Sequence, residues 1–542
     1  MNKNYFFILL FCLFLLKTLP AQEALKSIEE DYYDFLALRG LTERPALNYR
    51  TLSDSVWSVE EDTSHPWQDN NLGVFHPLFG DFRLRVYGPD LFMSFNTAAP
   101  YGQNDGVLWQ GRGFNSLFKG GVRFEGYGVE LTLLPHFAFS QNAAFEIMPS
   151  YYENEYGYFW GYGGPRSNGG GMDAPQRFGN EPFFDWDFGD SEIRYTWKTL
   201  TIGFGTQAIW LGPAYLNPIL HSNNAPSYPK FDIGLRRQKV TIPGVNWYAG
   251  DIEARFWVGR LTESDYFDND DTNNYTMFHG MSFAYAPSFL PGLTLFVDRV
   301  CLAPWTWENL KYVFLSIQDV EDIKMTIGFS WLFQQVGFEV YGEMGIDDWI
   351  SGTLGKLRRP FHTTVYGFGL KKSLSIKPAK KIYGELLLEF DWMEKTMEYA
   401  ITSYSFYAHH LLNHGYTNRG QWLGNGVSPV GNAQSICFTL YYPEGNSSIM
   451  ISRNNPNTHY IYENEILIGD NEQEYKFHNA FWANVNIDLL TKYYITRNFM
   501  VLGGVSYNLI INQNFKRKIS NNVSDDILTH NFYFQLGVKY NL

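Results

Sequence analysis

Residues 531–542, with the sequence NFYFQLGVKYNL, alternate between two kinds of side chain up to the last position. Every second residue, from Phe532 to Leu542, is apolar or aromatic. The residues between them are mostly polar or small: Asn531, Tyr533, Gln535, Gly537, Lys539 and Asn541. Successive side chains of a β-strand point to opposite faces, so this period of two predicts a strand with one apolar and one polar face.

The composition of the whole chain indicates that such strands are numerous. The 542 residues include 44 Phe, 37 Tyr and 16 Trp, yet the mean hydropathy is −0.26. After Leu16 no run approaches the roughly 18 apolar residues of a membrane helix, which excludes a helical membrane bundle. Outward apolar bands, aromatic girdles and a polar interior produce this average. We therefore predict an all-β fold, a transmembrane antiparallel β-barrel.

The length of the chain sets the expected number of strands. At roughly 26 residues per strand and turn over about 460 residues, the barrel has about 18 strands, with 16 and 20 as the nearest alternatives. Glu385 and Glu389 alternate with apolar residues and are expected to line a wet lumen. Long irregular segments are expected outside the cell or folded into the lumen, at 142–190, 262–276, 303–324, 409–432 and 442–477.

The first 21 residues have the features of a signal peptide. Lys3 provides a positive start, residues 5–16 an apolar stretch, and residues 19–21 (LPA) a cleavage site with a small final residue. Cys12 suggests a lipoprotein alternative, but Phe11 stands before it where a small residue is expected. We expect export to the outer membrane of a diderm bacterium. The alternation up to Leu542 resembles the C-terminal insertion signal of outer-membrane barrels, so the expected partners are the barrel assembly machinery and outer-membrane lipid.

A helical region is predicted between the signal peptide and the barrel. Residues 23–39 carry an apolar stripe that includes Tyr32 and Leu36, and Gly40 follows as a stop. The expected division of the chain is a signal peptide at 1–21, a periplasmic helical region and connector at 22–77, and the barrel with its long loops at 78–542.

Charge and cysteine content exclude some partners. The formal net charge of −14 makes nucleic acid an unsuitable ligand. Beyond Cys12, the chain has Cys301 and Cys437, which can form at most one disulfide and cannot form a zinc cluster on their own. We predict no metal and no cofactor.

Four groups of short motifs combine aromatic, amide and glycine residues. They read FNT at 95–97, YGQNDG at 101–106 and LWQGRGFN at 108–115; DAPQRFG at 173–179; WLGP at 210–213, NPIL at 217–220 and SNNAP at 222–226; and HGYTNRG at 414–420 with LG at 423–424. In order and approximate spacing they resemble the capsule assembly protein Wzi family. The resemblance spans roughly residues 28–542, although the last hundred residues match only as a generic barrel, and Leu542 stands where family barrels commonly end in an aromatic residue.

The resemblance implies an outer-membrane barrel with a small periplasmic helical portion. It further implies lectin-like binding of capsular or related surface polysaccharide, which helps capsule assembly or retention at the cell surface, without catalysis. The expected oligomeric state is a monomer.

The motifs also contain the residue types that a sugar site requires. Sugars offer apolar faces for aromatic rings and hydroxyl groups for amides and charged forks. In the first group Trp109 is a candidate platform and Arg112 a fork suited to uronates. The candidate site residues are Asn104, Asp105, Trp109, Arg112 and Asn115, then Trp210, Asn217, Ser222, Asn223 and Asn224, and finally His414 and Tyr416. The alternative for each is a structural role, since Asn commonly bonds to nearby backbone in turns.

Two other functions stay open at this point. A barrel of this width could be a porin or a substrate-selective channel, with Glu385 and Glu389 favouring cations. A hydrolase has little support: neighbouring acids such as Asp347 and Asp348 diverge on a strand, and no serine motif accompanies His409, His410 or His414.

Overall fold

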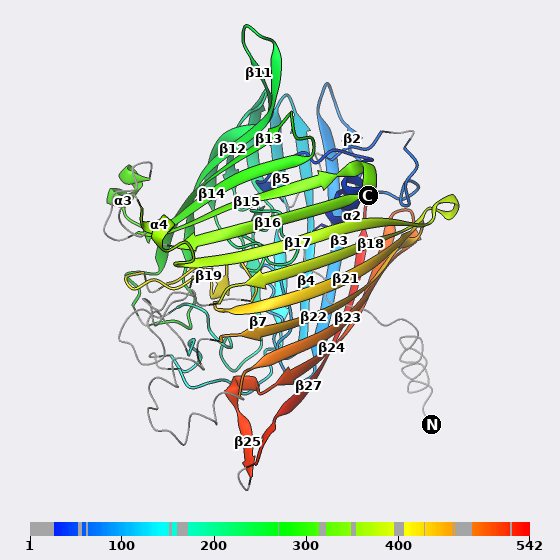
Figure 1. Ribbon diagram of the computed structural model, residues 1–542. Coiled ribbons are helices and arrows are strands. Elements are labelled where there is room, and N and C mark those ends of the chain that lie inside the picture. The colour runs from blue at the N-terminus through cyan, green and yellow to red at the C-terminus, as the bar shows by residue number, and fades with distance from the viewer. Residues whose placement is uncertain are drawn as a thin grey trace, which may run out of the picture.

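The computed structural model describes residues 27–542 except 52–56, 61–62, 151–153, 160–171, 269, 314–320, 348–353, 395–405, 413, 428, 459, 461–479 and 521–522. The predicted signal peptide and the glycine-rich tract at 161–171 lie outside these residues. Among the described residues, none of the helices has the length and apolar composition of a membrane span. The strands form a closed antiparallel barrel (Figure 1).

The barrel has 18 strands, as predicted. The segments β5 and β6 form one interrupted strand because both pair with β4, and β7 and β8 form another. The wall consists of β3 (Arg83–Asn96), β4 (Gly113–Gly126), β5 (Val129–Leu133), β6 (His136–Ser140), β7 (Phe183–Asp187), β8 (Glu192–Trp197), β9 (Leu200–Gly205), β11 (Lys230–Ile242), β12 (Trp247–Thr262), β13 (Tyr275–Pro287), β14 (Leu293–Pro304), β15 (Asp322–Phe333), β16 (Phe338–Asp347), β17 (Thr364–Lys377), β18 (Ile382–Trp392), β21 (Gly431–Tyr442), β22 (Gly445–Pro456), β23 (Ala483–Thr496), β24 (Phe499–Ile511) and β27 (Leu528–Tyr540).

Short elements accompany the wall. They are the strands β1 (Arg50–Thr51), β2 (His76–Pro77), β10 (Ile209–Trp210), β19 (Thr417–Asn418), β20 (Gln421–Trp422), β25 (Arg517–Ser520) and β26 (Val523–Asp526), and the helices α2 (Ile28–Leu38), α3 (Trp307–Tyr312) and α4 (Gly355–Arg358). Three single 3₁₀ turns lie at 334–336, 378–380 and 513–515.

The C-terminal strand closes the barrel and confirms the alternation from which it was predicted. β27 pairs with β24 on one side and with β3 on the other, where Phe534 lies opposite Phe95. Phe532 and Phe534 are each 46% exposed on the outer face, whereas Tyr533 between them is fully buried. The apolar face of the strand therefore points outward, as required for contact with lipid.

The two ends of the barrel differ in the length of their connections. At one end the strands are joined by short turns, such as residues 198–199 and 497–498, and at the other by long segments such as 141–182 and 393–430. Two predicted loops are wrong in part: residues 142–190 contain the wall segment β7, and residues 442–477 contain the wall strand β22. Its sequence GNSSIMISRNNP has few apolar residues, because only one face of the strand meets lipid and the other carries Ser and Asn. Short turns are typical of the periplasmic end.

The N-terminal helix lies inside the short-turn end of the barrel, beside the C-terminus (Figure 1). Ser27 caps α2 by accepting a hydrogen bond from the Glu30 N–H (3.3 Å). The ring of Tyr32 stacks on Trp67 with ring centroids 4.0 Å apart. Glu29 pairs with Lys539 of β27, and Asp34 with Lys371 of β17 (2.5 Å). The helix is shorter than the predicted 23–39, of which residues 23–26 lie outside the described part.

Candidate functional site

The lumen contains chain segments that hydrogen-bond to acidic residues of the wall. Glu389 on β18 accepts hydrogen bonds from the backbone N–H groups of residues 215–217 (2.7–2.9 Å) and from the hydroxyl of Tyr341 (2.8 Å). Glu343 accepts one from the Ile219 N–H (3.0 Å). A buried carboxylate is costly unless it has such donors. The prediction that Glu389 lines a wet channel is therefore wrong, because an inward-folded segment occupies its oxygens.

Asparagine side chains join the first and third motif groups. Asn104 adopts a left-handed backbone conformation (φ 58°), which Asn tolerates. Its backbone N–H donates to Oδ1 of Asn224 (2.6 Å), and its Nδ2 donates to the carbonyl of Leu216 (2.9 Å). Nδ2 of Asn223 donates in turn to the Asn104 carbonyl (3.2 Å). Residues 101–106 and 216–224 thus form one unit inside the barrel.

This unit forms one wall of a cavity of about 390 Å³, which we call the amide cavity. The opposite wall is the inner face of β21, β22 and β23, and the segment around Trp422 forms a third side. Its aromatic lining residues are Tyr101, Trp109, Tyr158 and Trp422, and its amides are Gln103, Asn104, Gln110, Gln176, Asn217, Asn224, Gln421, Asn454, Asn484 and Asn486.

A side cavity of about 260 Å³ shares part of this lining. Trp109 and Tyr158 border both spaces, and Trp482 borders the side cavity alone. The indole Nε1 of Trp109 and Oδ1 of Asn486 are buried and have no hydrogen-bond partner among the residues that the structure describes. Polar atoms of this kind normally bond to water or a ligand. The arrangement suits a ligand with apolar faces and many hydroxyl groups.

Comparisons with known proteins show a similar barrel fold. Residues 110–295 match the model of the capsule assembly protein Wzi family. The structure of Wzi from Escherichia coli, an outer-membrane protein involved in group 1 capsule assembly and described as a carbohydrate-binding β-barrel, is similar with a TM-score of 0.57. The match covers 97% of this chain and 100% of that chain at 13% sequence identity. The resemblance to the Wzi family is confirmed.

Other solved barrels are less similar to this chain. OccD1 (OprD) matches with a TM-score of 0.39 at 10% identity, covering 86% of this chain and 97% of that chain. Acinetobacter baumannii OccAB2 matches with a TM-score of 0.37 at 8% identity, covering 84% and 98%. No curated protein matches. The Wzi-like barrel fold agrees with the predicted location in the outer membrane.

Five of the twelve candidate residues chosen from the Wzi-like motifs lie around the amide cavity. They are Asn104, Asp105, Trp109, Asn217 and Asn224. Trp109 is half-buried, and the ring of Phe178, from the second motif group, contacts it edge-on with centroids 5.1 Å apart. The other face of the site comes from residues that the motifs did not indicate.

The remaining candidates bond to nearby chain segments and do not line this cavity. Arg112 donates to the carbonyls of Thr97 (3.1 Å) and Ala144 (2.6 Å), so its guanidinium is committed to backbone. Nδ2 of Asn115 donates to the carbonyls of residues 111 and 113. Trp210 is 1% exposed and donates through Nε1 to the Ala214 carbonyl (2.9 Å). These three side chains hold loops in place.

The same applies to the other Wzi-like candidates. The hydroxyl of Ser222 donates to the Gly424 carbonyl (2.7 Å), and that of Tyr416 to the Leu220 carbonyl (2.7 Å). Asn223 bonds to Asn104, as described above, and Nδ1 of His414 lies 2.8 Å from the hydroxyl of Thr276. These groups join the third and fourth motifs to each other and to the wall, so the motifs mark the framework of the site more than its lining.

The sequence analysis missed Trp422 and the lining residues on the wall strands. Trp422 directly precedes the LG pair of the fourth motif, and adjacency was its only signal. Asn484 and Asn486 lie on the inward face of β23, where alternation with outward Ile487 could have identified them. Tyr158 lies in a segment without recognisable pattern.

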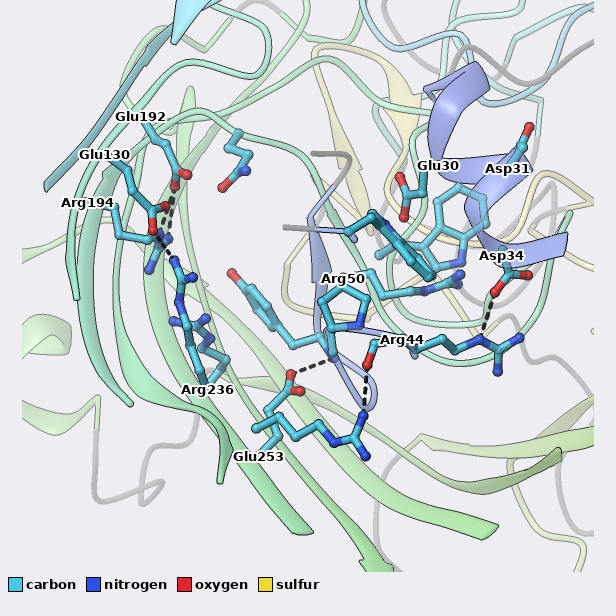
Figure 2. Close-up of a pocket in the computed structure, with 18 of the residues that line it drawn as sticks. Glu30, Asp31, Asp34, Arg44, Arg50, Glu130, Glu192, Arg194, Arg236 and Glu253 are labelled. Carbon is cyan, nitrogen blue, oxygen red and sulfur yellow. Dashed lines mark hydrogen bonds and ion pairs between the residues drawn. The ribbon is translucent and has the colours of Figure 1, made fainter. Parts of the chain in front are cut away.

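A third cavity, of about 110 Å³, lies at the short-turn end between the N-terminal segment and the wall. Figure 2 shows charged side chains around it. Most of them are paired: Arg194 with Asp232 (2.6 Å), Arg236 with Glu130 (2.6 Å), and Arg44 with Asp34 (2.7 Å). Because their charges are already matched, these residues hold the N-terminal segment against the wall.

The second motif group provides a test of pH dependence at the long-loop end. Asp173 is fully buried and accepts hydrogen bonds from the N–H and hydroxyl of Ser264. Its Oδ2 lies 3.9 Å from Nε2 of His414. Burial raises the pKa of Asp173 from 3.8 to about 7, against the effect of these bonds, and burial lowers the pKa of His414 to about 4. His414 is therefore uncharged near neutral pH.

We expect the contact between these loops to weaken as the pH rises. The unfolded loop loses the Asp173 proton near pH 3.8 and the folded loop near pH 7, so the contribution to stability is complete below pH 3.8 and declines up to about pH 7. Limited proteolysis of residues 172–179 should be slower at about pH 5 than at about pH 8. Asp173→Asn should reduce this difference, whereas Asp271→Asn, on an exposed part of the neighbouring loop, should preserve it. An unchanged difference in Asp173→Asn would contradict the assignment.

Proposed function

We propose that this protein is an outer-membrane lectin that binds capsular or related surface polysaccharide and helps to assemble or retain it at the cell surface. The observation that carries the proposal is the amide cavity, where Trp109 and Trp422 accompany an array of amides from several segments. Aromatic rings contact the apolar faces of sugars, and amides can donate and accept hydrogen bonds with hydroxyl groups. The carbohydrate binding described for Escherichia coli Wzi supports the same function.

The charge of the lining favours a neutral section of glycan. Asp105 and Arg453 are the charged residues among the described residues that border the amide cavity, one of each sign, and the Arg453 guanidinium lies on the outward side of β22, where it donates to Asn432 and Gln434. The guanidinium of Arg112, which the sequence suggested for uronates, bonds to backbone elsewhere. A site built for acidic sugars would need an excess of positive charge. We therefore propose that neutral sugar units occupy the amide cavity.

We further propose that binding occurs without cleavage. Glycoside hydrolysis ordinarily requires two carboxyl groups on either side of the scissile bond. Among the described residues of the amide cavity, Asp105 is the one carboxylate. A polysaccharide incubated with the protein should keep its length in size-exclusion chromatography.

The decisive experiment combines glycan binding with conductance. The purified barrel is titrated by calorimetry with surface polysaccharide from the cells that make it, and then inserted into a planar bilayer. Saturable binding by a protein that carries no steady current supports the lectin function. Large steady currents without polysaccharide binding would favour the alternative, a porin or substrate-selective channel.

Several further features belong to the same proposal. We propose a signal peptide at 1–21, a periplasmic helical region at 22–77 and a barrel at 78–542. The barrel assembly machinery is the proposed partner for the C-terminal strand, outer-membrane lipid surrounds the apolar outer band, and the protein acts as a monomer.

A further inference from the structure

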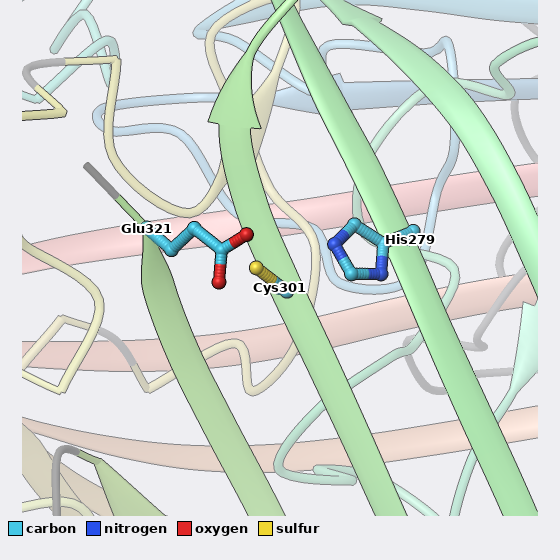
Figure 3. Close-up of side chains that lie close together, drawn as sticks. All are labelled: His279, Cys301 and Glu321. Atoms are coloured by element: carbon cyan, nitrogen blue, oxygen red, sulfur yellow. The ribbon is translucent and has the colours of Figure 1, made fainter. Parts of the chain in front are cut away.

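Three side chains that can bind a metal ion meet near the long-loop end of the barrel (Figure 3). His279 lies on β13, Cys301 lies opposite it on β14, and Glu321 directly precedes β15. One ligand atom from each residue lies within 4.8 Å of the other two. In Figure 3 the three side chains come from neighbouring segments, and Cys301 lies between Glu321 and His279.

The cluster is on the outer face of the wall, away from the amide cavity. His279 shares its face of β13 with Met281, which is 45% exposed. His279 and Cys301 are nevertheless only 1% and 0% exposed. Nearby on the same face, α3 and Val313 pack against Met277 and Ala303. This covered position beside α3 shelters the cluster from solvent.

The imidazole of His279 has an unsatisfied atom within the cluster. Its Nε2 is buried and has no hydrogen-bond partner in the part of the chain that the structure describes. A buried polar nitrogen without a partner costs free energy. A bound ion would satisfy it, since the neutral imidazole nitrogen is a common metal ligand.

The donor set and its spacing suit a zinc-like ion. Three atoms no more than 4.8 Å apart all lie within about 2.8 Å of a common point, and each ligand atom reaches a bonding distance of about 2.0–2.3 Å when it moves roughly 0.5–0.8 Å toward that point. Nitrogen, sulfur and carboxylate oxygen together favour Zn²⁺ over Mg²⁺ or Ca²⁺, which prefer oxygen alone.

The charge around the cluster also permits a divalent cation. Arg299 is close enough to interact electrostatically with all three residues. A Cys301 thiolate and a Glu321 carboxylate contribute two negative charges, and Arg299 offsets one of them. The ion then replaces the thiol proton, which is released to solvent on binding.

We propose that His279, Cys301 and Glu321 bind a divalent transition-metal ion of the zinc type, with water completing the coordination. The ion links β13, β14 and the chain entering β15. Its role is structural, because it ties the segment that carries α3 to the outer face of the wall. This site is independent of polysaccharide binding.

The test uses Co²⁺ as a spectroscopic probe and Zn²⁺ as its competitor. The full chain, purified in detergent with chelator, is titrated with Co²⁺. We expect one ion per chain, a thiolate-to-cobalt charge-transfer band, displacement by Zn²⁺, and a higher Tm with either metal. Absence of the band and of any metal-dependent shift in Tm would overturn the proposal.

Matched variants locate the ion. Cys301→Ser should remove the band and weaken binding at least about tenfold. Cys437→Ser, which removes the cysteine on β21, should bind as the natural protein does. His279→Gln provides a second test in case Cys301→Ser fails to fold, as judged by heat-modifiable migration in gels. Equal binding by the natural protein and either of the two cluster variants, or loss of the band in Cys437→Ser, would contradict the assignment.

Discussion

Trp109→Ala is expected to weaken polysaccharide binding by about thirtyfold, which corresponds to roughly 2 kcal/mol for an aromatic anchor at the centre of an interface. Trp109 borders both the amide cavity and the side cavity, so a glycan in either space meets its ring. The indole Nε1 is buried and has no hydrogen-bond partner among the described residues, so a shift of the ring on binding would let it donate to a hydroxyl group. Calorimetric titration with the polysaccharide measures the change.

The fold should tolerate this substitution because Trp109 is only half-buried and lies on an inward segment outside the wall strands. Trp307→Ala is the matched control: Trp307 is 84% exposed on α3, outside the barrel. Trp109→Phe should retain part of the affinity, since it keeps a flat ring and loses the indole N–H. Unchanged affinity in Trp109→Ala, or an equal loss in Trp307→Ala, would count against the amide cavity as the binding site.

The barrel could be predicted from the sequence because its signal is local. In β27 the alternation along the chain alone shows which face each side chain is on. Phe534 points outward and Tyr533, its neighbour, points inward. The signal weakens where the lipid-facing side chains are few, as in β22, where inward Ser452 and Asn454 alternate with outward Ile451 and Arg453. The sequence of such a polar strand looks like that of a loop. Its pairing with β21 and β23 in the structure identifies it as a strand.

The site could be predicted only in part, because its contacts join residues far apart in sequence. Asn104 and Asn224 were both recognised as amides near aromatic residues, but their hydrogen bond depends on how two inward segments meet. Whether an amide or guanidinium faces a cavity or a backbone carbonyl is likewise decided by tertiary contacts. Arg112 and Asn115 bond to carbonyls, whereas Asn217 lines the cavity, although all three lie in the short motifs that suggested the site.

Asp34→Ala is expected to destabilise the docked N-terminal segment by about 3 kcal/mol, because removing one partner leaves buried charges unpaired. Asp34 joins Arg44 (2.7 Å) and Lys371 (2.5 Å), and the Lys371 side chain is 4% exposed. Arg44 also binds Glu339 (2.6 Å) and keeps that partner in the variant. The buried charge left without its ion pair to Asp34 is therefore mainly that of Lys371. Thermal unfolding and the rate of proteolytic release of residues 27–51 measure the effect.

The control for this variant is Glu43→Ala. The Glu43 side chain is 83% exposed and pairs with Arg237 at 3.4 Å, and an exposed pair of this kind contributes less than about 1 kcal/mol. The same Tm and proteolysis rate in both variants would show that the Asp34 contacts do not hold the segment. Conductance should stay silent in both, since Glu389 still holds residues 215–217 in the lumen.

Acid should release the N-terminal segment, with the sign opposite to that of Asp173. Burial raises the pKa of Asp34, but attraction to Arg44 and Lys371 outweighs burial and holds its pKa well below the usual value. Glu29 shows the same balance: attraction to Lys539 overcomes burial and lowers its pKa from 4.5 to about 2. Depressed values stabilise the docked state above the ordinary pKa, and this contribution is lost as the pH falls from about 4.5 towards 2. Proteolytic release should therefore accelerate in that range for the natural protein and change less in Asp34→Ala, which lacks one of the two carboxylates that must be protonated.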